Sequence, residues 1–105
     1  MEIIETALFT EKITDVLSDD EYSELQWALV INPTAGLLIP GSHGLRKLRW
    51  AIPGKGKSGG LRIIYYWYRP DEIIYMLLPY KKSEQEDLTR EQMRKLVNYV
   101  KRGVL

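Results

Sequence analysis

Two segments in the first third of the chain carry apolar residues at helical spacing. Residues 2–7 predict a short strand, and residues 9–17 then place apolar side chains at i, i+4, i+7 and i+8: Phe9, Ile13, Val16 and Leu17. Ser18 and Glu21 form the sequence signature of a capping box, which predicts the start of a second helix. Asn32-Pro33 ends that helix, because proline disfavours helical geometry in the residue before it.

The middle of the chain changes to a pattern typical of strands. The glycines and prolines of residues 36–44 predict a loop. Residues 45–52 and 61–69 are rich in β-branched and aromatic side chains, and the Gly, Pro and Lys residues between them predict a hairpin connection. A turn leads to residues 73–81, whose almost unbroken apolar run is typical of a strand covered on both faces.

The end of the chain predicts another helix. Thr89 and Gln92 form a second capping box, and apolar residues follow at helical spacing: Met93, Leu96, Val97 and Val100. The order β-α-α-β-β-β-α indicates an α+β fold with a mostly antiparallel four-stranded sheet. We expect the helices to pack chiefly on one face and to leave the other face free for a ligand. The length of 105 residues suits one domain, residues 1–105.

Composition excludes several classes of chemistry. The absence of cysteine removes disulfides, thiolate catalysis and cysteine-based zinc sites. The histidine and the carboxylates show no metal-ligand spacing, and we expect neither a metal nor a cofactor. The first residues carry no basic region before an apolar run, and no apolar stretch approaches the length needed to cross a bilayer. We therefore expect a cytoplasmic protein without a membrane partner.

Charge is segregated along the chain, although the net charge is only +1. No Asp or Glu occurs between Leu25 and Pro70, and seven basic residues lie there: Arg46, Lys47, Arg49, Lys55, Lys57, Arg62 and Arg69. Trp50 and the aromatic residues 65–68 are interleaved with them. Cations attract phosphates and flat rings stack on bases, so this composition favours a nucleic-acid-binding face. The alternative is a solvated basic loop beside ordinary core aromatics.

Residues 51–60, AIPGKGKSGG, match a relaxed phosphate-loop pattern through Gly56, Lys57 and Ser58. That motif requires a helix whose N-terminus faces the phosphates, whereas the sequence that follows, LRIIYYWY, predicts a strand. We therefore expect a hairpin connection rather than a nucleotide-binding loop.

A group of cations is predicted to converge on one face of the sheet. Residues two apart in a strand share a face, so Lys47 and Arg49 point together. Arg62 follows on the adjacent strand, and Lys82 lies at the far end of the third strand. Clustered like charge costs stability, but it is useful for holding a phosphodiester.

RNA cleavage requires a base for the 2′-hydroxyl, cations for the pentacoordinate phosphate and an acid for the leaving 5′-oxygen. His43 is the only histidine, and its PGSHG loop indicates a solvent-facing residue. A lysine can replace histidine as the base only where several cations and partial burial lower its pKa. The acids of residues 84–91 are expected to favour the start of the last helix instead.

Three motifs occur in order over about residues 41–97: GLRKLRWA, GKGKSGGLRIIYYW and YKKSEQEDLTREQMRKL. Their combination resembles the RelE/HigB superfamily of toxins from bacterial toxin–antitoxin modules, closest to the HigB-type branch. The resemblance implies a small RelE-like fold and a metal-independent, ribosome-dependent endoribonuclease that cleaves mRNA in the decoding site. It also implies inhibition by a cognate antitoxin, which we expect to be a helix-turn-helix protein encoded next to it.

The resemblance assigns roles to individual basic residues. Lys47 and Arg49 match the basic pair on the family's second strand, and Arg62 matches the arginine after the hairpin loop. These residues would hold the scissile phosphate and share proton transfer. Lys82 lies where many members have an arginine, and it would stabilise the phosphate further. The predicted RNA-binding residues around this catalytic group are Arg46, Lys55, Lys57 and Lys81.

One departure from the family leaves the general base open. RelE has an active-site tyrosine near its C-terminus, where this chain has Leu88, and Lys47 is the first candidate for the base. Two other functions also stay open: a non-catalytic RNA- or DNA-binding module that uses the same basic face, and an interaction protein that docks a partner peptide. The sequence predicts no oligomeric state.

Overall fold

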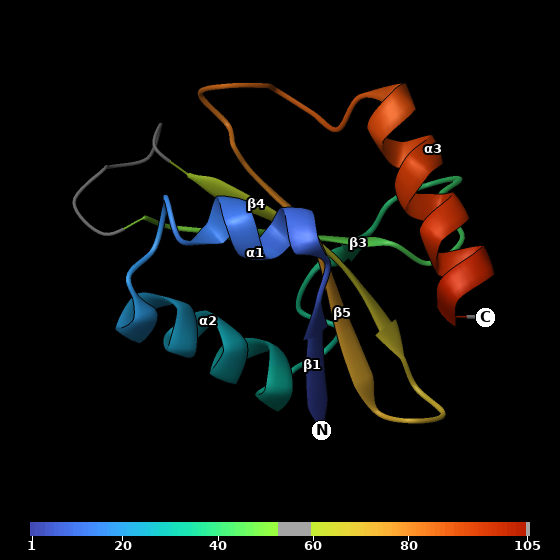
Figure 1. Cartoon of the computed structure of the whole chain (residues 1–105), viewed down its shortest axis with the longest axis horizontal. Helices are drawn as coiled ribbons and strands as arrows, with labels where there is room; N and C mark the ends of the chain where they lie inside the picture. Colours follow the sequence, from blue (N-terminus) through green and yellow to red (C-terminus); the bar gives the residue numbers. More distant parts are fainter. Residues whose placement is uncertain (53–59, 105) are drawn as a thin grey trace.

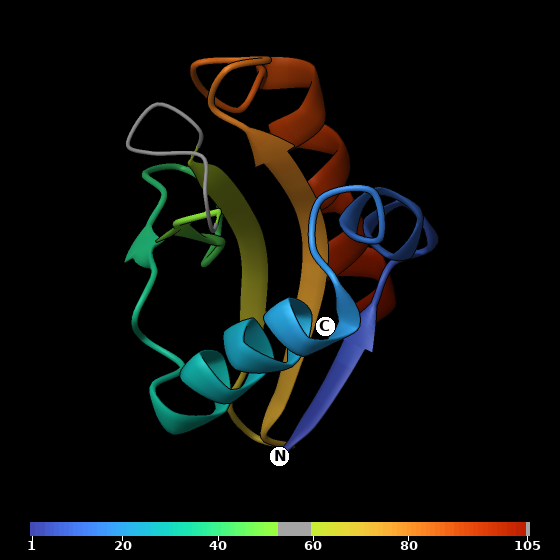
Figure 2. The ribbon, with the colours of Figure 1, turned by 90° about the vertical axis from the view of Figure 1, so that its left-hand side faces the viewer.

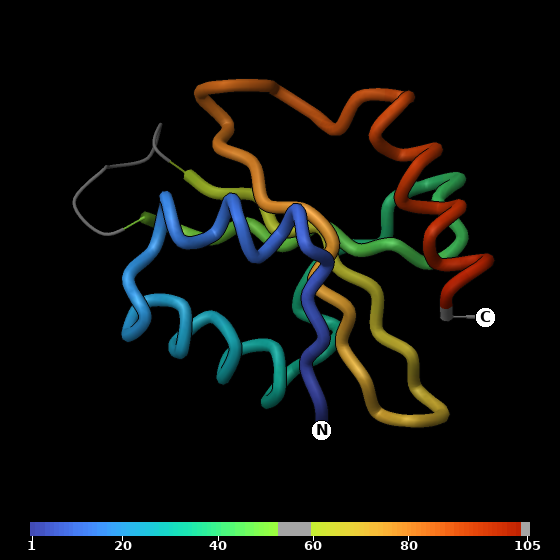
Figure 3. The backbone as a smooth tube through the Cα atoms, viewed as in Figure 1, coloured from blue at the N-terminus to red at the C-terminus, as the bar shows by residue number. Residues whose placement is uncertain are grey.

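A mixed five-stranded sheet lies at the centre of the protein, in the order β1-β5-β4-β3-β2 (Figure 1). The computed structural model describes residues 1–52 and 60–104. The strands are β1 (Glu2–Glu5), β2 (Leu37–Leu38), β3 (Arg46–Trp50), β4 (Leu61–Tyr68) and β5 (Ile73–Lys81). β1 runs parallel to β5, as the neighbouring blue and orange segments of Figure 3 show, and the other pairings are antiparallel.

The α+β class and the mostly antiparallel sheet are therefore confirmed, whereas the predicted four strands and their order are wrong in detail. Leu37–Leu38, which the sequence placed in a loop, pairs with β3 and adds a fifth strand at the sheet edge. A strand of two residues carries no periodic signal, and only the neighbouring strand defines it.

Helices cover both faces of the sheet. They are α1 (Ala7–Ile13), α2 (Asp19–Ile31) and α3 (Arg90–Tyr99), which continues into the π-helical segment η2 (Val100–Val104). Figure 2 shows α2 in front of the sheet and α3 behind it. The expectation that one face stays free is therefore wrong, because β4 and β5 carry apolar residues on both faces and both need cover. No helix in the described part of the chain has the length and apolar character to cross a membrane.

The two predicted capping boxes are confirmed. The Glu21 backbone N–H donates to Ser18 Oγ at 3.2 Å, and the Ser18 N–H donates to Glu21 Oε1 at 2.8 Å. Thr89 and Gln92 exchange the equivalent bonds at the start of α3, each at 3.0 Å. These contacts satisfy backbone donors that would otherwise lack a partner in the first turn, so both helices begin where the sequence predicts.

Two hydrophobic cores lie on opposite faces of the sheet. The core under α1 and α2 contains Phe9, Ile13, Leu25 and Leu29 packed on Leu61, Ile63, Tyr65, Ile74 and Met76. The core under α3 contains Leu45, Ile64, Leu77, Leu78, Tyr80 and Val100, with Leu88, Leu96 and Val97 at its margin. Residues of β5 occur in both cores, as expected for a strand covered on both faces.

A β-bulge divides β5. Ile64 pairs with Leu78, but the next residue of β4, Tyr65, pairs with Met76, so Leu77 is an extra residue in β5. The bulge interrupts the alternation of side chains: Met76 packs under α1 and α2, whereas both Leu77 and Leu78 pack under α3. As a result Tyr80 also lies on the α3 face, and regular alternation from Met76 would have placed it on the other one.

Candidate functional site

Three basic residues of β3 and β4 share the α3 face of the sheet; we call Lys47, Arg49 and Arg62 the cationic cluster. Leu48 and Trp50, which alternate with them in β3, pack against the opposite core, as the sequence predicts. Arg49 lies directly opposite Arg62 in the antiparallel ladder. Two like charges in such a pair repel each other, so this arrangement lowers stability unless an anion compensates it.

The cross-strand row continues from the cluster into β5. Arg62 pairs with Arg49 on one side and with Tyr80 on the other, so these three residues form one row across three strands. Arg49 is exposed at one end of the row, whereas Arg62 and Tyr80 are 9% and 7% exposed. The row therefore runs from solvent into the margin of the α3 core.

Arg62 is the most buried cation of the cluster. Its guanidinium makes one hydrogen bond within the described residues, a long contact of 3.4 Å to the carbonyl of Leu61. Within the same part of the chain no carboxylate forms an ion pair with it. Buried charges are normally paired, because burial removes their hydration. An unpaired buried guanidinium is thus a candidate site for an anionic ligand.

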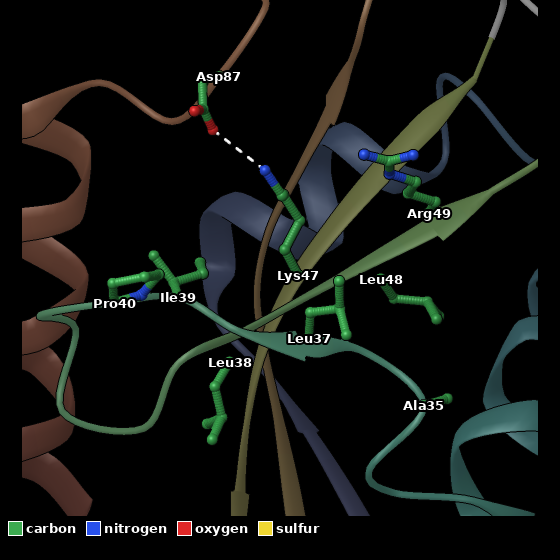
Figure 4. Close-up of a pocket in the computed structure, with 9 residues that line it drawn as sticks. All are labelled: Ala35, Leu37, Leu38, Ile39, Pro40, Lys47, Leu48, Arg49 and Asp87. Atoms are coloured by element: carbon green, nitrogen blue, oxygen red, sulfur yellow. Dashed lines mark hydrogen bonds and ion pairs between the residues drawn. The ribbon is translucent and has the colours of Figure 1, made fainter.

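Asp87, in the loop that follows β5, forms an ion pair with the cluster. Its Oδ1 lies 3.2 Å from Lys47 Nζ and also accepts the backbone N–H of Leu88 at 2.9 Å (Figure 4). The Leu88 hydrogen bond and then the Lys47 ammonium lower the pKa of Asp87 below its ordinary value of 3.8. The expectation that this acid only favours the start of the last helix is incomplete, because its carboxylate reaches β3.

The Tyr80 hydroxyl is buried without a hydrogen-bond partner in the described part of the chain. Burial raises its pKa, the charge of Asp87 raises the pKa further and the charge of Arg62 lowers it. The hydroxyl therefore keeps its proton at neutral pH and can donate it to an acceptor. Sequence reasoning missed Tyr80, since its position on this face depends on the bulge in β5.

A groove of about 560 Å³ adjoins the cluster. Lys47, Arg49 and Asp87 line one part of it, and the rest is mainly apolar: Ala35, Leu37, Leu38, Ile39, Pro40 and Leu48 (Figure 4). Leu37 pairs with Lys47 in the sheet and is 75% exposed. The groove thus offers cations for a charged ligand and aliphatic side chains for an apolar one.

Two of the other predicted site residues, Arg46 and Lys81, lie on the opposite face of the sheet from the cluster. Arg46 alternates to the opposite face and donates to the carbonyls of Gly36 at 2.7 Å and Thr34 at 3.4 Å. Lys81 pairs with Leu61 and lines a small cavity of about 240 Å³ at the end of α1. Lys82 is exposed just after β5, where its N–H donates to Gly60 at 3.0 Å.

Lys55 and Lys57 lie outside the described residues. The AIPGKGKSGG stretch that contains them connects the antiparallel strands β3 and β4. A strand follows it at Leu61, as the sequence predicts, whereas a phosphate loop requires a helix there.

The aromatic residues of β3 and β4 lie mostly on the wrong face to stack on bases at the cluster. Trp50 and Trp67 pack against the core under α1 and α2. Tyr65 is fully buried there, donates its hydroxyl proton to Pro33 O at 2.6 Å and accepts the N–H of Gly36 at 2.9 Å. The two hydrogen bonds of Tyr65 hold the segment before β2 in place, and all three residues pack in the core, as the alternative expected of these aromatics. His43 is exposed in the loop before β3 with a positive φ of 60°, as expected of a loop residue.

Residues 1–52 and 60–104 contain no group of three acidic or histidine side chains placed to hold a metal ion. The polar side chains described above for this face are Lys47, Arg49, Arg62, Tyr80 and Asp87. Comparison of the chain with models of known protein families finds no match.

Proposed function

We propose that this protein is a RelE/HigB-type toxin of a toxin–antitoxin module, with a RelE-like fold, and that it cleaves translated mRNA on the ribosome. The observation that carries the proposal is the cross-strand pair of Arg49 and Arg62, with Lys47 beside it on the same face. Such a group is costly for a structural protein and useful for a protein that binds a phosphodiester. The choice of this family rests on the resemblance of the three sequence motifs in residues 41–97.

The cluster suits the charge that develops during RNA cleavage. Attack of the 2′-oxygen produces a pentacoordinate phosphate, and Arg49 and Arg62 are placed to stabilise its oxygens. Lys82 supplies a further cation from the end of β5, and the lysines of residues 53–59 contact the RNA backbone. No step of this scheme uses a metal.

Lys47 remains the proposed general base, under one condition. Its ion pair with Asp87 requires the charged ammonium, whereas a base must first lose its proton. Lys47 therefore acts as a base only after substrate or ribosome separates it from Asp87 and the freed ammonium releases its proton to solvent; the neutral amine then accepts the proton of the 2′-hydroxyl.

The partner that we propose is an antitoxin encoded by the neighbouring gene. The exposed apolar side chains of Leu37 and Leu38 on β2 offer a surface for it, whereas exposed Trp27 on α2 lies beside Met1 and Ile3, near the other edge of the sheet. A segment bound along β2 would lie beside Lys47 and would restrict access of RNA to the cluster.

Induced expression tests the function directly. The wild-type protein should arrest growth and leave translated mRNA cleaved, whereas Lys47→Gln combined with Arg49→Gln should abolish both effects. Arg94→Gln combined with Lys95→Gln is the matched control, because it removes two exposed cations of α3 outside the cluster. Equal toxicity of the cluster variant and wild type would reject the assignment of the site.

The non-catalytic alternative has one observation in its favour. The cluster consists of two guanidiniums and an ammonium that donates to Asp87, and all three groups are hydrogen-bond donors without an acceptor atom. If the protein is an RNA- or DNA-binding module, it should bind nucleic acid with strong salt dependence and leave mRNA intact on programmed ribosomes.

A further inference from the structure

The buried end of the Arg49–Arg62–Tyr80 row combines a guanidinium without a carboxylate partner and a hydroxyl without a hydrogen-bond partner among the described residues. The Arg62 guanidinium has no carboxylate partner in the described residues, and residues 53–59, PGKGKSG, contain none. The Tyr80 hydroxyl beside it has no hydrogen-bond partner in the described part of the chain. A cation and a hydroxyl donor thus lie side by side on one face of the sheet.

An unsatisfied buried hydroxyl is unfavourable. The hydroxyl has lost its hydration without gaining a protein partner, and a phenylalanine at the same place would avoid that cost. Trp67 also has a buried N–H without a partner in the described residues, but it packs in the other core, and the cation beside it, Arg69 at 5.2 Å from the ring centre, is exposed. Tyr80 differs because the positive charge beside its hydroxyl, that of Arg62, is itself buried.

We propose that the Arg62 guanidinium and the Tyr80 hydroxyl together form a subsite for a non-bridging oxygen of an RNA phosphate. The identification of the ligand as an RNA phosphate rests on the proposed function. A phosphate oxygen accepts hydrogen bonds from both groups and neutralises Arg62, so one ligand satisfies both side chains. Burial raises the pKa of Tyr80, which keeps the hydroxyl protonated as a donor.

The subsite is closed in the free protein. Arg62 and Tyr80 are 9% and 7% exposed, and the segment with Asp87 lies close enough to raise the pKa of Tyr80. A phosphate that replaces Asp87 as the partner of Lys47 releases Asp87, and the loop that carries Asp87 then moves away from the row. Phosphate binding and opening of the Lys47–Asp87 pair are therefore coupled.

Tyr80→Phe tests the subsite, because it removes only the hydroxyl oxygen. Inorganic phosphate is titrated into purified, ¹⁵N-labelled protein, and the Arg62 Nε–H signal reports binding. We expect Tyr80→Phe to weaken phosphate binding about tenfold or more, without loss of stability in urea. Tyr75→Phe, on the same face of the same strand, is the matched control and should bind like wild type.

Unchanged phosphate affinity of Tyr80→Phe would overturn the inference, and a large loss of stability in the same variant would then assign the hydroxyl a structural role. The assay needs no ribosome, so its outcome is separate from that of the proposed function. Phosphate binding that depends on Tyr80 in a protein that leaves mRNA intact would support the subsite and reject the nuclease. Cleavage by Tyr80→Phe at the wild-type rate would reject the subsite alone.

Discussion

Arg49 and Arg62 lie directly opposite each other on β3 and β4, with both side chains on the α3 face. Within the described residues neither one forms an ion pair with a carboxylate. The protein therefore carries an electrostatic cost at this point of the sheet, which an RNA phosphate would offset on binding. Stability and activity should consequently respond in opposite directions when the pair is removed.

Arg49→Gln should stabilise the protein and inactivate it. Removal of the like-charge contact should raise the free energy of unfolding by about 0.2–1 kcal/mol in urea. Loss of one cation at the phosphate should lower mRNA cleavage about a hundredfold. Added salt should reduce the gain in stability, because salt screens the repulsion in the wild-type protein.

The control for this variant is Arg94→Gln on the exposed face of α3, which should change the unfolding free energy by less than about 0.5 kcal/mol. A lower stability of Arg49→Gln at every salt concentration would show that the arginine pair is not repulsive.

Local sequence signals were sufficient to predict most of the helices and strands and part of the candidate site. The capping boxes, the proline after α2 and the alternation in β3 act between residues close in the chain, and each of these predictions is confirmed. Lys47 and Arg49 share a face because they are two positions apart in one strand, with only Leu48 between them. The pairing of Arg49 with Arg62 required the register of the hairpin, which the sequence left conditional.

The rest of the site depends on contacts between distant residues. Tyr80 reaches the α3 face through the bulge at Leu77, and a continuous apolar run gives no sign of a bulge. Asp87 contacts Lys47 across 40 positions of sequence. The prediction that one face of the sheet stays free was wrong for a related reason. The sequence indicated that β5 is covered on both faces, but it did not indicate that α3 covers the second face.

Asp87→Asn should strengthen phosphate binding and change the response to acid. The variant removes the carboxylate that competes for Lys47, so affinity for inorganic phosphate should rise between about 1.5- and 5-fold. The Leu88 N–H and the Lys47 ammonium lower the pKa of Asp87 in the folded protein. Its ionised form therefore contributes stability above pH 3.8, and that contribution disappears as the pH falls through the folded-state pKa.

Urea unfolding over a pH series checks this assignment. The wild-type protein should be slightly more stable than Asp87→Asn at pH 6, and the difference should vanish in acid below pH 3.8. Glu86→Gln is the control, because this exposed neighbour makes no ion pair in the described part of the chain and should change neither property. A difference that grows in acid would contradict the role of the Asp87 carboxylate.

Thr6 links the first helix to the bulge that places Tyr80. Its hydroxyl oxygen accepts the Phe9 N–H at 3.0 Å as the cap of α1 and donates to the Leu77 carbonyl at 2.9 Å. Thr6→Val keeps the shape but loses both bonds, so the free energy of unfolding should fall by about 1–2 kcal/mol. Thr6→Ser keeps both bonds and should lose less.

The same pair of variants tests whether the bulge supports the site. The Thr6 N–H also donates to Met76 O at 3.0 Å, so Thr6 contacts both residues at the point where β5 changes its alternation. If this contact holds Tyr80 on the α3 face, Thr6→Val should weaken phosphate binding while Thr6→Ser binds like wild type. Affinity is measured on folded protein without denaturant, so that lower stability alone does not affect it. Wild-type affinity of Thr6→Val would mean that strand pairing alone, through Ile64 and Leu78, fixes the position of Tyr80.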